Sequence, residues 1–571
     1  MVAMRVLSAA EMQACDRATT ERFGVASIDL MRAAAGAVAA FAQMQFPHAR
    51  RVTVLCGRGN NGGDGMMAAR LLATAGLEVT AVLLGAPERL GADVVTAWSE
   101  LLASARPGAV QVIETAKELT SHGEALRADL LVDAIVGTGF KPPLKGLALA
   151  ALEWIGESRA PILSVDLPSG WAADGTAAAP EGPVFPSDAV ITFTAPKPAH
   201  VFAQLTRLWD QPVVVAPIGS PDEAIVSKLG LEWAGSSLAL VQAPRAVASN
   251  KGNFGHVLVV GGSYSATGVR SGAPAMSALG ALRSGAGLVT AAAPAAVLPM
   301  VAAVTPELMT WPLAAGAAGG ISADALAPEA LDALMAGKTV LAIGPGIGQG
   351  PEAVKFVTGL LAATKIPAVI DADALNILAA KPVLLSKLAK GRTVVLTPHP
   401  GEMARLAGIT VAEVQANRLE VARGFARRFG VTLVLKGART LIADPDGRVA
   451  VNTTGNPGMA KGGSGDLLTG LVAGLLAQHP PCAGSGDAAR AVAAAVCLHG
   501  LAADLAVRGP DADQDEHTLL ATDSLRQFSR AFRFQWRGEN GYVWLQGASH
   551  AAGIACNSPL LWGMTEVRYG E

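Results

Sequence analysis

Two long stretches of this sequence alternate short aliphatic runs with segments of helix length. The first stretch runs from about residue 7 to residue 215, and the second begins near residue 256. Such alternation is typical of parallel sheets covered by helices. The passage at about 218–248 has a weaker pattern and contains Ser220-Pro221-Asp222, which indicates a connector. We therefore predict two fused α/β domains.

The aliphatic runs give the expected positions of individual strands. They are 52–56, 79–84, 130–135, 162–165 and 189–193 in the first stretch, and 256–260, 339–343, 368–370, 393–396 and 432–435 in the second. A helix is expected at 66–75. Two more, at 467–477 and 488–507, are apolar nearly all round, as helices packed into an interior are.

Charge and composition exclude several classes of protein. The 571 residues carry 45 basic and 47 acidic side chains, so the basic excess that binds nucleic acid or an anionic membrane is missing. The uncharged stretch 284–306 is interrupted by two glycines and two prolines, and is predicted to be buried core rather than a membrane-spanning helix. Glu11 and Asp16 occupy the place where a secretory signal needs apolar residues, so a cytoplasmic location is expected. Cysteine and histidine spacings indicate neither a disulfide framework nor a transition-metal site.

A glycine-rich segment, GRGNNGGDG at residues 57–65, follows the first expected strand and precedes a helix. In this setting G-x-G-x-x-G lets the backbone approach a pyrophosphate, while the helix N-terminus offers free amides to the anion. The next strand ends in Leu83-Leu84-Gly85, without the acidic residue that ordinarily binds ribose. An ordinary dehydrogenase is therefore disfavoured.

Two further loops carry carboxylates directly after strands. VDAIVGTGF at 132–140 contains Asp133, and SVDLPSG at 164–170 contains Asp166 and Ser169. Because ligands of open α/β sheets bind at the carboxyl ends of the strands, we expect these loops and the glycine-rich segment to form one site. Asn61, Asp133 and Ser169 would offer only oxygen ligands, which hard cations prefer.

A second glycine-rich segment, NPGMAKGGSGD at 456–466, runs into the helix expected at 467. Amides of residues 462–465 can face a phosphate and stabilise charge that develops during its transfer. Asp466 is placed to take a proton from an attacking hydroxyl; the simpler alternative is that it caps the helix. Since the segment is not the nucleotide loop G-x-x-x-x-G-K-[ST], a ribokinase-like kinase is the natural physical class.

The first-half motifs NNGGDG, VDAIVGTGF and VDLPSG resemble those of the NAD(P)H-hydrate epimerase family, over about residues 1–215. The resemblance implies a Rossmann-like fold, interconversion of the R and S forms of hydrated NADH or NADPH at carbon six, and a potassium site at Asn61, Asp133 and Ser169. We hypothesise that Asp166 handles protons. The implied contacts of the hydrate are Asn60, Asn61, Gly62, Gly63, Asp64, Gly137, Thr138, Gly139, Phe140 and Asp166.

The second-half motifs KGNFGH, GPGIG, DADALN, TPHPGE, KGA and NPGMAKGGSGD are similar to those of the ADP-dependent NAD(P)H-hydrate dehydratase family, which has a ribokinase-like fold. The resemblance covers about residues 245–530 and implies that ADP phosphorylates the S hydrate, after which phosphate is eliminated and AMP remains. Magnesium is expected from the charge of the nucleotide. The implied hydrate contacts are Ala273, Gly346, His399 and Asp466, and the implied nucleotide contacts are Lys436, Gly437, Ala438, Arg439, Thr440 and Gly465.

The order of the two halves matches that of the family of bifunctional NAD(P)H-hydrate repair enzymes. We predict a Rossmann-like three-layer epimerase domain at 1–240, a ribokinase-like dehydratase domain at 241–530 and an unassigned tail at 531–571. We expect small-molecule substrates and a homo-oligomer. Two alternatives remain: a kinase of a vitamin precursor or sugar, and a non-catalytic first half that binds a ligand or partner and tunes the second.

Overall fold

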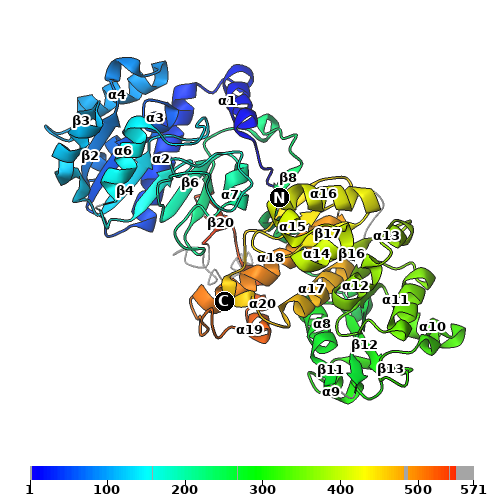
Figure 1. Cartoon of the computed structure of the whole chain (residues 1–571). Helices are drawn as coiled ribbons and strands as arrows, with labels where there is room; N and C mark the ends of the chain where they lie inside the picture. The colour runs from blue at the N-terminus through cyan, green and yellow to red at the C-terminus, as the bar shows by residue number, and fades with distance from the viewer. Residues whose placement is uncertain (1–2, 157, 266–267, 481–486, 539, 548–571) are drawn as a thin grey trace, which may run out of the picture.

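The computed structural model describes residues 3–156, 158–265, 268–480, 487–538 and 540–547. It contains two α/β halves, each built around a largely parallel sheet with helices on both faces (Figure 1). The predicted pair of fused α/β domains is therefore confirmed.

The first sheet has eight strands in the order β20-β7-β6-β5-β4-β1-β2-β3, and every neighbouring pair is parallel except β20 with β7. Its strands are β1 (Arg51–Cys56), β2 (Glu78–Leu84), β3 (Val110–Ile113), β4 (Leu130–Ala134), β5 (Ile162–Val165), β6 (Ala189–Phe193), β7 (Val213–Ala216) and β20 (Val543–Gln546). The helices of this half are α1 (Ala9–Phe23), α2 (Ser27–Gln45), α3 (Asn60–Thr74), α4 (Ala92–Ser104), α5 (Ala116–Leu119), α6 (Gly146–Ile155) and α7 (Pro198–Phe202).

Both faces of the first sheet are buried, as expected for parallel strands covered by helices. Val54 packs into the cluster that contains α2 and α3, whereas its neighbour Leu55 packs into a separate cluster with Leu119 of α5 and Trp154 of α6. Because successive side chains of a strand point to opposite faces, this division places α2 and α3 on one side of the sheet and α5 and α6 on the other.

The second sheet has ten strands in the order β13-β12-β9-β14-β15-β16-β17-β18-β19-β8, parallel from β13 to β17. Its strands are β8 (Leu231–Trp233), β9 (His256–Val260), β12 (Leu288–Pro294), β13 (Met309–Leu313), β14 (Val340–Ile343), β15 (Ala368–Ile370), β16 (Val394–Leu396), β17 (Thr432–Leu435), β18 (Leu441–Ala443) and β19 (Val449–Val451); β10 (Ser263–Ser265) and β11 (Gly268–Arg270) form a separate hairpin. The helices are α8 (Gly272–Arg283), α9 (Leu298–Ala302), α10 (Pro328–Met335), α11 (Pro351–Ala363), α12 (Ala372–Ala379), α13 (Val383–Leu388), α14 (Pro400–Ala407), α15 (Val411–Ala416), α16 (Arg418–Phe429), α17 (Ser464–Gln478), α18 (Asp487–Arg508), α19 (Ala521–Arg526) and α20 (Phe528–Arg533).

All ten expected strands form, with ends that differ by at most one residue. The stretch 284–306 is core only in part: β12 is buried, as predicted, whereas most of 295–306, which contains α9, is exposed. α17 and α18 also form as predicted. α18 is long and apolar enough to cross a membrane, but 94% of its most apolar window is buried inside the molecule, so it serves as a core helix here.

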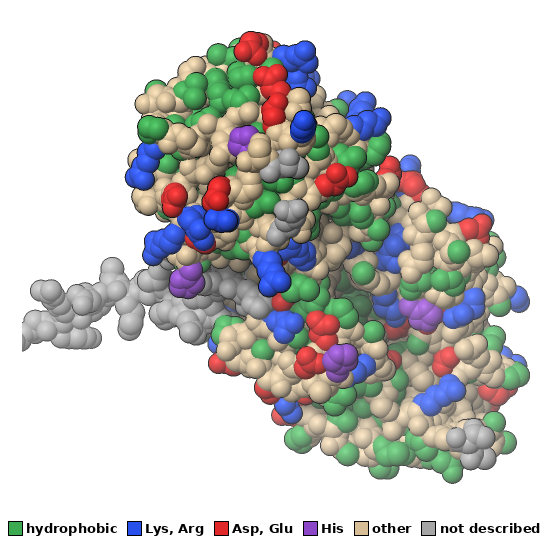
Figure 2. Space-filling model, turned by 60° about the vertical axis from the view of Figure 1, so that its left-hand side comes forward, with side chains coloured by type: hydrophobic (Ala, Val, Ile, Leu, Met, Phe, Trp, Pro, Cys, Tyr) green, Lys and Arg blue, Asp and Glu red, His purple; other side chains and the backbone are tan. Residues whose placement is uncertain are grey.

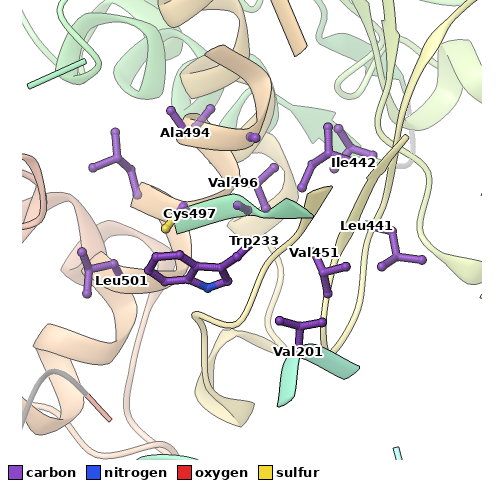
Figure 3. Packing of buried hydrophobic residues seen from close by; sticks show 14 of the residues in the cluster. Val201, Trp233, Leu441, Ile442, Val451, Ala494, Val496, Cys497 and Leu501 are labelled. Atoms are coloured by element: carbon purple, nitrogen blue, oxygen red, sulfur yellow. The ribbon is translucent and has the colours of Figure 1, made fainter. Parts of the chain in front are cut away.

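Segments from outside each predicted domain complete its sheet. β8 lies inside the predicted connector, yet it pairs with β19, and Arg5 forms a bridge to Glu232. Trp233 of β8 is buried among Val201, Val451 and residues of α18 (Figure 3). At the other end of the chain, β20 adds an antiparallel strand to the first sheet. The described part of the tail therefore contacts both halves: β20 pairs with β7 of the first sheet, and Trp536 packs on Trp233 of the second.

Candidate active sites

The helix after β1 begins earlier than predicted. α3 starts at Asn60 rather than at residue 66, so NNGGDG forms the first turns of the helix instead of a free loop. A Cβ on Gly62 would lie 1.8 Å from the carbonyl oxygen of Gly57, and one on Gly65 would lie 2.6 Å from Ala134 Cβ. These glycines therefore let α3 approach the end of the sheet closely.

A cavity of about 1490 Å³ opens at the carboxyl ends of β1, β4 and β5. Most of the predicted hydrate contacts line it: Asn60, Asn61, Asp64, Gly137, Thr138, Gly139, Phe140 and Asp166. Gly62 and Gly63 are not among the lining residues. A Cβ on Gly62 would point at the Gly57 backbone and one on Gly63 at the Met31 side chain. The expectation that three separate loops form one site is thus met by the geometry.

Asp166 is held by a dense set of contacts. Lys197 Nζ lies 3.0 Å from its Oδ1, Thr192 Oγ1 donates to the same oxygen at 2.9 Å, and the Thr138 amide donates to Oδ2 at 2.7 Å. Thr138 Oγ1 also donates to Oδ2. Burial alone would raise the pKa of Asp166, but the Lys197 ammonium and these hydrogen bonds outweigh it and hold the pKa well below its usual value. Asp166 is therefore ionised at neutral pH.

Asp133 and Ser169 lie together beneath the cavity. Ser169 Oγ donates to Asp133 Oδ1 at 2.6 Å, and the Ser169 amide donates to Oδ2 at 2.7 Å. Burial raises the pKa of Asp133 to about 6, and no Lys or Arg among the described residues pairs with it. Asn61 faces Gly137 nearby, and its buried amide nitrogen has no hydrogen-bond partner among the described residues. Oxygen donors around a buried carboxylate without a basic partner fit a hard cation.

In the second half, the predicted phosphate loop leads into α17. Gly463 is the N-cap, with φ 93°, and Asp466 lies three residues further on, in the first turn. Asp466 is therefore not the N-cap residue, which leaves the capping alternative without support. Burial and the nearby Asp371 raise the pKa of Asp466 to about 6, while Lys436 acts against this rise.

Lys436 joins three of the second-half motifs. Its Nζ lies 3.0 Å from Asp371 Oδ1 and 4.0 Å from Glu402 Oε2, and a Cβ on Gly465 would lie 3.3 Å from it. Asp371 Oδ2 accepts a hydrogen bond from Thr469 of α17 at 2.6 Å. The DADALN, TPHPGE and GGSGD segments therefore meet around one buried ammonium.

The predicted hydrate contacts of this half lie around the same loops. A Cβ on Gly346 would lie 3.6 Å from Ala273 Cβ, in the first turn of α8. In the same helix, Ser277 Oγ donates to the Asp466 carbonyl at 2.8 Å. His399 is the N-cap of α14: its Nδ1 accepts from the Gly401 amide at 3.0 Å. Burial and nearby Lys436 lower the pKa of His399, which favours the neutral ring.

The predicted nucleotide contacts divide into two groups. Lys436, Gly437 and Thr440 stay together, with Thr440 Oγ1 donating to the Gly437 carbonyl at 2.8 Å, and Ala438 lies between them in the chain. The guanidinium of Arg439 instead donates to the carbonyls of Thr453 and Ala203, at 3.2 and 3.0 Å. Its side chain therefore lies between the two halves, so only its backbone can serve the predicted nucleotide site.

Three polar residues of these sites were missed by sequence reasoning. Lys197 follows β6, which is the next strand along the same sheet edge, so the loop rule used for β4 and β5 would have found it. Asp371 belongs to the DADALN motif but received no role. Asp16 lines the cavity from α1, a helix that carries no motif.

Known proteins match both halves. The family model described as YjeF-related protein N-terminus matches residues 27–199, and that described as NAD(P)H-hydrate dehydratase matches residues 257–524. A protein of Moorella thermoacetica called bifunctional NAD(P)H-hydrate repair enzyme Nnr is 41% identical over 91% of this chain and 95% of its own length. An Escherichia coli protein of the same name is 32% identical over 90% of this chain and 91% of its own.

Solved structures also match. The ADP/ATP-dependent NAD(P)H-hydrate dehydratase of Bacillus subtilis, co-crystallised with ATP and Mg²⁺, is 32% identical, with a TM-score of 0.40, and the match covers 52% of this chain and 96% of that one. A yeast structure, ynu0, is 25% identical with a TM-score of 0.32, and the match covers 38% of this chain and 88% of that one.

Fold and sites together define a two-domain α/β enzyme with a Rossmann-like first half and a ribokinase-like second half, as predicted from the sequence. The chain belongs to the family of bifunctional NAD(P)H-hydrate repair enzymes.

Proposed function

We propose that the first half interconverts the R and S forms of hydrated NADH and NADPH, and that the second half dehydrates the S form with ADP, releasing AMP and phosphate. One observation carries this proposal: the motifs of the first half line one cavity that contains Asp166, while those of the second half meet around Lys436 beside Asp466. Such an arrangement supports two separate reactions in one chain, at 1–240 and 241–530.

In the first half, the ionised carboxylate of Asp166 acts as the base. It takes a proton from the hydroxyl group on the reacting carbon or from water. Lys197, Thr138 and Thr192 fix its two oxygens. The amides of 137–140 and the start of α3 contact the hydrate, and the size of the cavity, about 1490 Å³, suits a dinucleotide. General-base assistance of this kind is worth about 10²–10⁴ in rate.

Asn61, Asp133 and Ser169 would hold the potassium ion. When bound, the ion would neutralise the Asp133 carboxylate and keep the turn after β5 in place. Ser169 lies three residues after Asp166, so its hydrogen bonds to Asp133 help to fix the direction of the Asp166 side chain. The support for this part is the chemistry of the donors: the buried Asp133 carboxylate has no basic partner, Ser169 contacts it, and Asn61 adds a third oxygen-bearing side chain near Gly137.

In the second half, Asp466 takes the proton of the hydrate's hydroxyl as that oxygen attacks the terminal phosphorus of ADP. The amides of the GGSG segment and the Lys436 ammonium face the transferring phosphoryl group, where they offset its charge. Magnesium, bound chiefly through the nucleotide phosphates, would supply further charge neutralisation. Elimination of phosphate from the product restores the dihydronicotinamide.

The substrates in this proposal, hydrated NADH or NADPH and ADP, are small molecules. Side chains of both charges are interspersed on the face of the molecule in Figure 2. We also infer a cytoplasmic location, from the sequence, and a homo-oligomeric state. Both reactions in one chain suit each other, because the first supplies the epimer that the second accepts.

The test is absorbance at the dihydronicotinamide band after the protein is added to a mixture of both epimers with ADP or ATP, Mg²⁺ and K⁺. We expect full recovery with ADP. Recovery of only the S fraction would contradict the epimerase part, and no recovery with either nucleotide would contradict the dehydratase part and favour a kinase of another substrate.

A further inference from the structure

Three carboxyl groups line the first cavity close enough to affect one another. Asp166 comes from the turn after β5, Asp64 from the start of α3 and Asp16 from the middle of α1. The charge of Asp166 raises the pKa of both Asp16 and Asp64, in addition to the larger effect of burial. Lys197 is the basic side chain that pairs with Asp166. Mutual repulsion in a cluster of this kind favours keeping a proton on one of its carboxyl groups.

Asp16 differs from the other two because it reaches the cavity from a separate wall. Met12, Asp16 and Thr20, four residues apart on α1, all line the cavity, so one face of this helix forms that wall. The helix is tied to the rest of the first half at its N-terminus, where the Ala9 amide donates to Asp174 Oδ1 at 2.7 Å. The Lys228 amide donates to Glu11 Oε1 at 2.6 Å.

One oxygen of Asp16 is unused. Asp16 Oδ1 is buried and has no hydrogen-bond partner among the described residues. Leaving a buried polar group unsatisfied is costly, so such a group in a cavity is a candidate for bonding a ligand. Burial raises the pKa of Asp16; Lys197 acts against this rise and Asp166 adds to it. This raised pKa makes Asp16 better suited to hold and donate a proton than an exposed aspartate.

We propose that Asp16 is a second catalytic residue of the epimerisation, which works as the acid where Asp166 works as the base. This inference rests on the proposed epimerase function. Epimerisation inverts one carbon, so groups must reach its hydroxyl on one face and a water on the other. Asp16 on α1 and Asp166 at the sheet edge reach the cavity from two different elements, which suits that requirement.

The carbon that carries the hydroxyl is also bonded to the ring nitrogen. The Asp16 proton passes to the hydroxyl oxygen, the C–O bond breaks with its electron pair leaving as water, and the nitrogen lone pair forms a C=N⁺ bond. Water then adds to the opposite face, and its proton passes to the Asp166 carboxylate. In the reverse direction the two carboxyls exchange roles.

The test uses the full chain and compares Asp16→Asn with wild type for the rate at which purified R hydrate becomes S hydrate. We expect kcat to fall by about 10²–10⁴ with little change in KM, because the amide keeps the shape but cannot donate the acid proton. Asp16→Glu should restore part of kcat. Dehydration of purified S hydrate by the same chain reports folding, and Asp29→Asn, an exposed change on α2 outside the cavity, is the matched control.

Epimerisation in H₂¹⁸O tests the bond that breaks. The enzymatic product should gain one ¹⁸O for each inversion, after the spontaneous reaction is subtracted. Wild-type kcat in Asp16→Asn, or inversion without ¹⁸O, would overturn the inference, as would full loss in Asp64→Asn with none in Asp16→Asn. If Asp16→Asn also loses dehydration, the pH profile of epimerisation by Asp16→Glu decides: a profile identical to that of wild type would overturn the inference. A wild-type chain that does not epimerise at all would instead contradict the proposed function.

Discussion

The buried ion pair of Asp166 and Lys197 is the residue-scale feature on which the first site depends. Asp166→Asn should lower epimerisation by about 10²–10⁴ because the base is removed. It should also lower the stability of the first half, because Lys197 would be left buried without its counter-charge, a change that costs about 3–5 kcal/mol. The measurements are the rate of R-to-S conversion and the melting temperature. The double variant Asp166→Asn/Lys197→Met should regain stability without activity, and recovery of activity would exclude Asp166 as the base.

Asp466 sets the expected pH dependence of dehydration. It acts as a base only when ionised, and its pKa is raised to about 6. The rate should therefore fall as the pH falls through about 6, by about tenfold for each further pH unit. The measurement is kcat/KM between pH 5 and pH 8 with purified S hydrate, so that epimerisation does not enter. Because Lys436 lowers the pKa of Asp466, Lys436→Met should move the acid limb of the pH–rate profile to higher pH. If the acid limb does not move, it reports the ionisation of a group other than Asp466.

Asp133 gives a prediction about ions. Burial raises its pKa to about 6, and a bound cation would favour the ionised form and so tighten the loops around it. Replacing K⁺ by tetramethylammonium should lower both the epimerisation rate and the melting temperature of the first half, while dehydration of S hydrate changes little. Asp133→Asn should remove this dependence on K⁺. Equal rates and equal melting temperatures in the two salts would contradict the cation site.

At the scale of elements, the start of α3 depends on glycine. A Cβ on Gly62 would lie 1.8 Å from the Gly57 carbonyl oxygen, so Gly62→Ala should push α3 away from β1 and abolish epimerisation. We expect a loss of more than about 2 kcal/mol in stability, typical of a forced backbone shift. Gly36→Ala on α2 is the matched control: nothing lies within 4 Å of the added Cβ, and Ala in a helix is favourable by about 0.5–1 kcal/mol. Equal melting temperatures of the two variants would contradict the close packing.

The central strands and the motifs at their ends were predictable, whereas helix starts and side-chain directions were not. Buried parallel strands such as β9 read as continuous aliphatic runs, and their carboxyl ends locate the loops of the site. The start of α3 was misplaced because glycines read as loop, although here they serve close packing. The positions of two side chains could not be predicted from local sequence pattern. The pattern does not show that α1, with Asp16, forms a wall of the cavity, nor that the Arg439 guanidinium bridges the two halves.

At the scale of the whole molecule, each sheet includes a strand from outside the predicted bounds of its half. β8 joins the second sheet although it precedes the predicted boundary at residue 240, and β20 joins the first sheet from the C-terminal side of the second half. The rings of Trp233, in β8, and Trp536, in the segment before β20, pack edge to face with their centroids 5.1 Å apart. Such pairings join residues hundreds of positions apart, so short strands without a motif give no local sign of them. The two halves are therefore expected to unfold together.

Removal of β20 tests this coupling. A chain that ends at residue 533 loses the antiparallel partner of β7, the packing of Trp544 on Phe41 with ring centroids 5.9 Å apart, and the hydrogen bonds of Gln546 to Thr206 and Gln211. The truncation also removes the buried side chains of Phe534, Trp536, Tyr542 and Leu545, and burial of each large apolar side chain is worth about 1.5–3 kcal/mol, so the first half should melt at a lower temperature and epimerise more slowly. A chain that ends at residue 547 keeps every one of these contacts and should behave like the full chain. Equal melting temperatures for the two truncations would show that β20 is dispensable and that the first sheet is stable with β7 at its edge. If the shorter chain also dehydrates S hydrate more slowly, the coupling extends to the second half.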